Sequence, residues 1–187
     1  EQNIINGNDL YIERYCNEEN ANANYNSGCL LSHNKKYAVV RQSAFSYVES
    51  AFFLSGNGSW NYYHWLIEIL PKLQVYLELC LYKQDVKLLV PCAVKANENF
   101  NFLLNSILGD IKVDMIFVSR DFYLHVEHLY HLTPINNVLF NERKIGVSAN
   151  ILHLRYDSLA FIASKVQRFI LSNDDGMFSA ERVFLAI

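Results

Sequence analysis

Hydrophobic and polar positions alternate along the chain in two ways, one typical of strands and one typical of helices. Short apolar runs rich in β-branched and aromatic residues predict strands at 37–42, 47–54, 86–90, 113–118, 124–132 and 182–187. Longer segments with apolar residues three or four positions apart predict helices at 60–82, 97–108 and 157–171. Because these strands and helices alternate, we predict an α/β fold with a largely parallel sheet.

The first 36 residues have a different pattern. They are polar and contain closely spaced asparagines, and only the segment 10–15 has the character of a strand. We therefore divide the chain into a polar N-terminal extension, 1–36, with one strand, and a globular domain, 37–187.

The predicted helix 60–82 contains two ionisable residues, His64 and Glu68, in an otherwise apolar stretch. Residues four positions apart lie on one face of a helix, so the two side chains are neighbours. Burying either alone would cost several kcal/mol, so the pair must be bonded together, open to a cleft or shifted in pKa. Such pairs concentrate at functional sites, although structural ion pairs have the same pattern. Pro71 is expected to kink or divide this helix near Glu68.

Composition narrows the class of protein. A chain of 187 residues with 51% hydrophobic residues is long enough to bury a core. The net charge of −3 offers no basic surface for nucleic acid. No apolar run is long enough to span a membrane, and no signal-peptide pattern opens the chain. These features predict a cytoplasmic protein, either free or peripheral to the membrane.

The cysteines and histidines are not spaced as the ligands of a metal site. The four cysteines are widely spaced without a C-x-x-C pair, which predicts reduced thiols; they are Cys16, Cys29, Cys80 and Cys92. His125, His128 and His131 recur every third residue, but in a strand the middle one faces away from the other two. We therefore expect no metal site.

The segment 61–73, Asn-Tyr-Tyr-His-Trp-Leu-Ile-Glu-Ile-Leu-Pro-Lys-Leu, resembles the signature of the family 61 glycosyltransferases. The positions that match the signature are Tyr63, His64, Trp65, Glu68, Leu70, Pro71, Lys72 and Leu73. Later segments are similar to the family's following elements in order and spacing: 87–91, 102–109 and 126–134. The resemblance runs from about residue 37 to the C-terminus.

This resemblance implies the Rossmann-like N-terminal half of a GT-B glycosyltransferase, the half that shapes the acceptor side, with the second domain absent. It implies inverting transfer of a sugar from a nucleotide sugar to a glycan or protein hydroxyl, as in capsular or surface polysaccharide biosynthesis. The nucleotide sugar is expected to bind through the missing C-terminal half, and no cofactor is expected. The alternative is a truncated, catalytically inactive family member that acts only as a binding or interaction domain.

The resemblance also assigns roles to residues of the signature. Glu68 or His64 is the expected general base for the acceptor hydroxyl, because such a base must lie within hydrogen-bond reach of the proton it removes. Tyr62 and Tyr63, with Asn61, are the expected substrate-binding residues, since aromatic rings offer a platform for a sugar. Trp65 is the exception, for which a place in the core is favoured.

Two structural expectations follow. If His64 and Glu68 carry out chemistry, they should face a cleft with partial access to solvent. The predicted final strand, 182–187, should leave apolar surface where the absent domain would dock, which predicts self-association.

Overall fold

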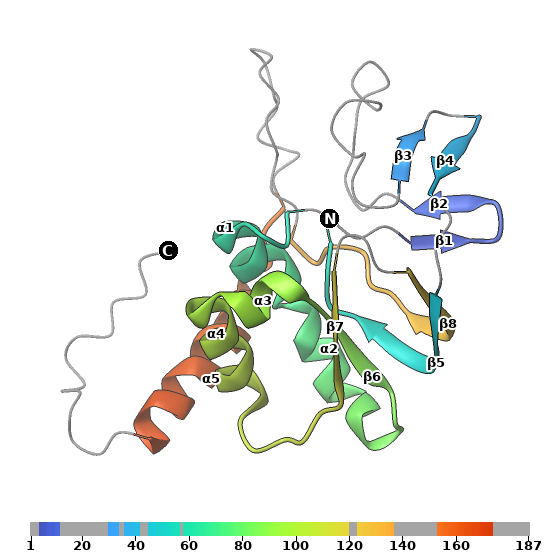
Figure 1. Cartoon of the computed structure of the whole chain (residues 1–187). Coiled ribbons are helices and arrows are strands. Elements are labelled where there is room, and N and C mark those ends of the chain that lie inside the picture. Colours follow the sequence, from blue (N-terminus) through green and yellow to red (C-terminus); the bar gives the residue numbers. More distant parts are fainter. Residues whose placement is uncertain are drawn as a thin grey trace, which may run out of the picture.

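A four-stranded parallel sheet lies at the centre of the protein (Figure 1). Its strands are β5 (Phe45–Phe53), β6 (Lys87–Pro91), β7 (Met115–Val118) and β8 (Tyr123–Tyr130), in the spatial order β7-β6-β5-β8. All three neighbouring pairs are parallel. The structure is a computed structural model that describes residues 4–11, 30–33, 36–41, 45–56, 58–119, 123–136 and 153–173.

The central strands are buried on both faces. Ala51, Phe52 and Phe53 of β5 are all buried, and so are Leu88 and Leu89 of β6. A continuous apolar run of this kind is what a parallel strand covered on both sides requires. The predicted strands at 47–54, 86–90, 113–118 and 124–132 are confirmed, with boundaries that differ by one to two residues.

The predicted helix 60–82 is divided into four short pieces. They are α1 (Tyr62–His64), the π-helix η1 (Trp65–Ile69), α2 (Lys72–Glu78) and the 3-10 turn η2 (Leu81–Lys83). The break falls at Pro71, which precedes the first residue of α2, so the expected division is confirmed. The π-helical turn was not predicted.

The other two predicted helices are found where the spacing of apolar residues predicts them. They are α4 (Glu98–Leu108) and α5 (Tyr156–Ser172), and a short helix that was not predicted, α3 (Cys92–Ala96), precedes α4. The side chain of Asn97 accepts hydrogen bonds from the backbone N–H groups of Asn99 and Phe100, which caps α4.

Two antiparallel hairpins precede the sheet, and they add to the single strand expected before residue 37. β1 (Ile4–Asn6) pairs with β2 (Asp9–Tyr11), and β3 (Leu30–His33) pairs with β4 (Ala38–Val40). The described residues of the segment 1–36 therefore include three strands, and the division at residue 36 stays a prediction. The predicted strand at 37–42 pairs with β3 outside the four-stranded sheet. In the first hairpin, Gly7 takes a positive φ of 58° in a two-residue turn, a position that favours glycine.

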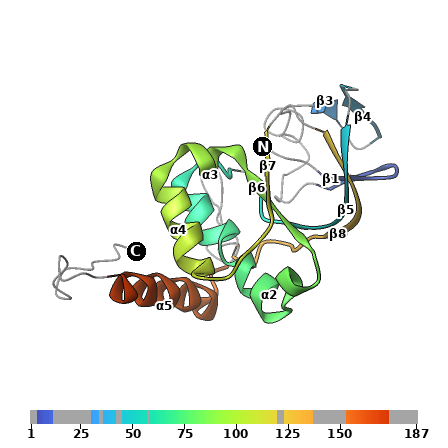
Figure 2. The same cartoon turned by 60° about the horizontal axis from the view of Figure 1, so that its bottom comes forward.

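Hydrophobic residues gather in two clusters on opposite sides of the sheet. The larger joins Phe52, Leu88 and Val90 to the helices through residues such as Tyr76 and Leu104. The smaller consists of Val48, Ala51, Phe53 and Leu89, and Ile4 of β1 packs against it. Figure 2 shows the corresponding layers, with α2, α4 and α5 on one side of the strands and the hairpins on the other.

The link between β7 and β8 departs from the usual pattern for parallel strands. Only positions 119–122 separate the two strands, although β6 and β5 lie between them in the sheet. Parallel strands usually need a crossover of a dozen or more residues. β5 and β8 curve together (Figure 2).

The expected fold class is thus confirmed at its coarser level, as an α/β protein with a parallel sheet flanked by helices. The finer prediction, a Rossmann-like half of a GT-B enzyme, remains a prediction. The final strand predicted at 182–187, and with it the expected docking surface, lies outside the described residues.

Candidate functional site

The strand order reverses between β5 and β8, because the chain moves from β5 outward through β6 and β7 and then places β8 on the other side of β5. In open parallel sheets, ligands bind beyond the carboxyl ends of the strands at such a reversal. The segment that leaves β5 leads to α1 and η1, which carry His64 and Glu68. The predicted pair therefore lies on the segment that follows the strand next to the reversal.

His64 and Glu68 form the pair that their spacing predicts. His64 Nδ1 lies 2.8 Å from Glu68 Oε2, and the residues are only 4% and 6% exposed. A carboxylate bonded to one ring nitrogen fixes the orientation of the imidazole. Mutual bonding removes the large cost that either group would meet if it were buried alone.

Pro71 explains the local geometry of this segment. Proline has no N–H, so it cannot donate to the carbonyl four residues earlier, which belongs to Ile67. One turn before it, the chain widens: Leu70 N–H donates to the carbonyl of Trp65 at 2.9 Å, five residues back. Turns of this π type are frequent at functional sites.

Asn136 completes the hydrogen bonding that Pro71 leaves open. Its Nδ2 donates to the Ile67 carbonyl at 2.7 Å and lies 3.1 Å from Ser158 Oγ. Its Oδ1 accepts from the backbone N–H of Arg155 at 2.6 Å. The fully buried Asn136 thus ties the loop after β8 to η1 and to the start of α5. Sequence reasoning missed this residue, because 69 positions separate it from Ile67.

Lys72 is a buried charged residue at the same end of the sheet. Its Nζ donates to the Ser55 carbonyl at 2.9 Å and lies 5.8 Å from the centroid of the Phe53 ring. Ser55 lies two residues after the end of β5, and it is also buried. The ammonium group therefore fixes the first turn of α2 to the end of the central strand.

The predicted substrate-binding residues lie around α1. Asn61 Oδ1 accepts from the Tyr63 N–H at 2.9 Å and caps the helix. Tyr62 and Tyr63 are each 48% exposed. The Tyr62 ring lies 5.7 Å from the Phe100 ring, and the Tyr63 ring meets the His64 ring edge-on at 5.8 Å. Both rings remain accessible to a ligand, and their substrate-binding role remains a prediction.

Trp65 belongs to the core, as expected. It is fully buried and stacks on Phe100 with the two rings 5.7 Å apart and within 6° of parallel. Its indole N–H has no hydrogen-bond partner in the described part of the chain. This stacking fixes η1 against α4, so the position of Glu68 depends on the core beneath it.

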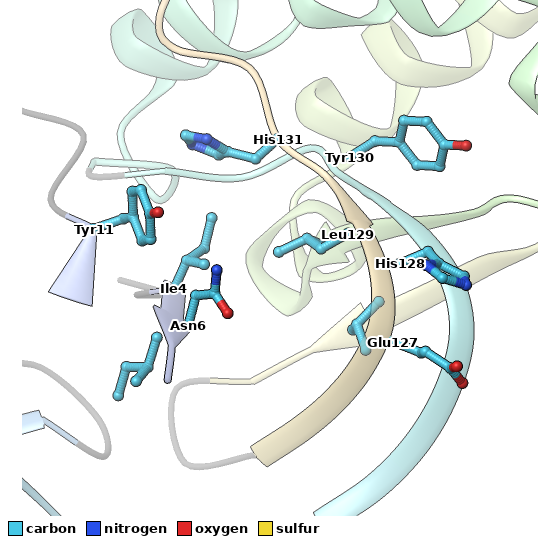
Figure 3. Close-up of a pocket in the computed structure, with 10 residues that line it drawn as sticks. Ile4, Asn6, Tyr11, Glu127, His128, Leu129, Tyr130 and His131 are labelled. Atoms are coloured by element: carbon cyan, nitrogen blue, oxygen red, sulfur yellow. The ribbon is translucent and has the colours of Figure 1, made fainter. Parts of the chain in front are cut away.

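His64 and Glu68 do not have the partial access to solvent that was expected if they carry out chemistry. The pair is buried, and a cavity of about 650 Å³ lies instead between β8 and the first hairpin (Figure 3). None of the predicted site residues lines that cavity. The spacing of the two residues predicted their bond but not their burial.

The predicted histidines and cysteines also have defined places. His128 and His131 both line the cavity, although a regular strand would place them on opposite faces. Within the described ranges, no three His, Cys, Asp or Glu residues converge as a metal site. Cys80 and Cys92 are free thiols, and Cys16 and Cys29 lie outside the described residues.

The chain matches no protein-family model, no curated protein and no solved structure. Over the residues that the structure describes, no helix has both the length and the apolar character needed to cross a bilayer.

Proposed function

We propose that the chain is the acceptor-side domain of an inverting glycosyltransferase that transfers a sugar from a nucleotide sugar to a glycan or protein hydroxyl. The observation that carries the proposal is the bonded His64–Glu68 pair in a π-helical turn after the central strand. The resemblance of the segment 61–73 to the family 61 signature supports it, since both residues of the pair belong to the matching positions. The finer fold, a Rossmann-like half of a GT-B enzyme, is part of the same proposal.

The geometry divides the roles within the pair. Because Glu68 bonds Nδ1 of His64, a proton from an acceptor hydroxyl would be taken up at Nε2 on the other side of the ring. His64 is then the general base, and Glu68 is the carboxylate that orients it. Tyr62 and Tyr63 supply exposed rings beside His64 for the acceptor sugar.

The burial of the pair favours a second candidate function. With both residues under 7% exposed and the described cavity elsewhere, the pair in this domain also fits a purely structural role. The chain is then a catalytically inactive binding or interaction domain, in which the ion pair stabilises the turn before Pro71.

The two functions are separated by an assay of the complete gene product. Release of nucleotide from UDP-xylose, UDP-N-acetylglucosamine and other nucleotide sugars is measured with a panel of glycan and peptide acceptors. Loss of a general base lowers a rate by roughly 10²–10⁴-fold, and we expect His64→Gln to do so. Glu68→Gln removes the carboxylate that orients the base, and it should also lower the rate. Residues 1–187 alone should transfer little or nothing, because the donor site is expected in the other half.

Glu78→Gln is the matched control. Glu78 accepts a hydrogen bond from Gln74 Nε2 at 2.9 Å, so it also belongs to a pair four residues apart, but on the exposed side of α2. This variant should keep the full rate. Unchanged rates in the His64 and Glu68 variants would exclude the catalytic role. A panel with no transfer by the complete protein, together with unfolding of the Glu68 variant, would instead support the binding domain.

A further inference from the structure

The hydrogen bond from Asn136 to η1 falls on the peptide unit that leads into Glu68. Asn136 Nδ2 donates to the Ile67 carbonyl at 2.7 Å, and Ile67 directly precedes Glu68. A peptide unit is planar and stiff from one Cα to the next. A support that holds the Ile67 carbonyl therefore also holds the backbone at Glu68.

The backbone at Glu68 in turn sets the position of the His64 ring. Glu68 Oε2 lies 2.8 Å from His64 Nδ1, and both side chains are buried. A carboxylate bonded to one ring nitrogen fixes where the other nitrogen, Nε2, points. A chain of contacts thus runs from Asn136 through the peptide unit between Ile67 and Glu68 to the ring of His64.

Asn136 is itself held in one orientation. The backbone N–H of Arg155 can only donate, and it bonds Asn136 Oδ1 at 2.6 Å. The donating nitrogen of the amide must then face the Ile67 carbonyl, and it also lies 3.1 Å from Ser158 Oγ. Because Pro71 has no N–H, the usual helical donor to the Ile67 carbonyl is missing, and the amide takes its place. Asn136 is thus a fixed support for η1.

We propose that Asn136 is a positioning residue for the His64–Glu68 pair, which it holds in the arrangement that the transfer reaction requires. This inference rests on the proposed function, because that function gives the pair its catalytic role. Asn136 acts through the backbone of η1. A misplacement of reacting groups by about 1 Å can lower a rate about 10²-fold, so loss of this support should slow turnover without weakening substrate binding.

Two variants remove the donor to Ile67 in different ways. Asn136→Ala removes the whole amide. Asn136→Asp keeps its volume and the oxygen that accepts from Arg155, but an ionised aspartate cannot donate. The Asp variant therefore tests the bond to η1 even where the Ala variant fails to fold. Ser158→Ala is the matched control, since Ser158 is also buried and bonds Asn136 from the side of α5.

The first readout needs no catalysis. A buried, hydrogen-bonded N–H exchanges slowly with water, so the Nδ1–H of His64 should give a resolved NMR signal in residues 1–187. Its absence in His64→Gln assigns it. Loss of one hydrogen bond to a buried carbonyl favours local opening about tenfold. We expect this proton to exchange faster by that factor in both Asn136 variants and at an unchanged rate in Ser158→Ala.

The second readout is sugar transfer by the complete protein, measured per folded molecule. We expect kcat to fall by about 10–100-fold in both Asn136 variants, while KM for donor and acceptor stays within about twofold. Ser158→Ala should keep kcat. A purely structural role of Asn136 would lower stability but leave kcat per folded molecule unchanged.

The outcomes separate this inference from the proposed function. An unchanged exchange rate of the His64 proton in the folded Asn136 variants would overturn the positioning role, and so would the lack of such a proton in the unaltered chain. Unchanged kcat in the Asn136 variants of a protein that transfers sugar would also overturn it, and the proposed function would stand. If the complete protein transfers no sugar but the proton exchanges tenfold faster, the proposed function fails and the positioning of the pair stands.

Discussion

Asn136 supplies a hydrogen bond that Pro71 removes from the helix. Pro71 leaves the Ile67 carbonyl without its helical donor, and a buried carbonyl without a partner is costly. The side-chain nitrogen of Asn136 donates to that carbonyl. Its side-chain oxygen accepts a hydrogen bond from the backbone N–H of Arg155, directly before α5. The proline and the asparagine therefore act as a functional unit, although they lie far apart in the chain.

The first prediction concerns this unit. Asn136→Ala leaves the Ile67 carbonyl and the Arg155 N–H without their side-chain partner, and each unsatisfied buried group costs about 1–3 kcal/mol. We expect the free energy of unfolding, measured with urea, to fall by about 3 kcal/mol. Asn173→Ala is the control, because Asn173 bonds the Phe169 carbonyl in an exposed position. Equal losses in the two variants would contradict the role of Asn136.

The second prediction concerns Tyr76 and alkaline pH. Burial raises the pKa of Tyr76 to about 12, and its hydroxyl donates to the Val86 carbonyl at 2.9 Å. Above pH 10 the unfolded chain loses this proton while the folded protein keeps it, so stability falls as the pH rises from 10 to about 12. Tyr76→Phe should cost about 1 kcal/mol at pH 8 and should reduce this alkaline loss. Urea unfolding at pH 8 to 11 measures both effects.

Tyr156→Phe is the control for that series, since Tyr156 is exposed at the start of α5. Its stability should equal that of the unaltered protein at pH 8. A Tyr76→Phe variant with an unchanged alkaline loss would contradict the assignment to Tyr76.

For single residues, the sequence predicts contacts between positions that are close together in the chain. The bond between His64 and Glu68 follows from their spacing, because helical geometry alone makes such residues neighbours. The contacts of Asn136 depend on the tertiary fold, so no local pattern reveals them. The burial of the pair likewise depends on the tertiary fold, so no local pattern reveals it.

Among the elements, α4 shows the clearest relation between sequence and boundary. Asn97 caps its start, and Gly109 ends it with φ 57° and ψ −128°, a conformation that residues with a Cβ rarely adopt. A Cβ at Gly109 would meet no atom within 4 Å, so any cost of adding one comes from the backbone conformation alone.

The third prediction tests this boundary. Gly109→Ala should lower the free energy of unfolding by about 1–2 kcal/mol, as is usual for a residue held in a sparsely populated conformation. Asp110→Ala, at the exposed neighbouring position, should change it by less than about 0.5 kcal/mol. Thermal or urea unfolding of the two variants makes the comparison. A Gly109 variant as stable as the Asp110 variant would show that the helix end relaxes without strain.

The helices and strands that the sequence predicts are those in which apolar residues recur at a regular spacing. β5, β6, α4 and α5 have apolar residues at strand or helix spacing over their full length, and they are found as expected. The hairpin strands β1 to β4 have only three or four residues each, too few for a periodic signal. The π-turn of η1 has no sequence signature of its own, and Pro71 indicated a break there but not its form.

For the whole molecule, the two hydrophobic clusters predict unequal local stability, which is the fourth prediction. β5 and β6 contribute to both clusters, whereas of the hairpin residues only Ile4 packs against one of them within the described residues. We expect the amides of 51–53 and 88–90 to exchange only through global unfolding. The amides of 4–11 and 38–40 should exchange through local opening with lower free energies. Native-state hydrogen exchange read by NMR gives both values, and uniform protection would contradict the prediction.

The unusual placement of β8 has a consequence for the order of events on the ribosome. Tyr47 of β5 and Glu127 of β8 contact each other across 80 residues of chain. At the usual speed of synthesis, about 5–20 residues per second, β5 waits for several seconds before its second partner has been made. During that interval the backbone edge of β5 that later pairs with β8 is unpaired, so a strand of another chain can pair with it. Expression at high rates should therefore produce aggregates that slower translation or a bound chaperone prevents.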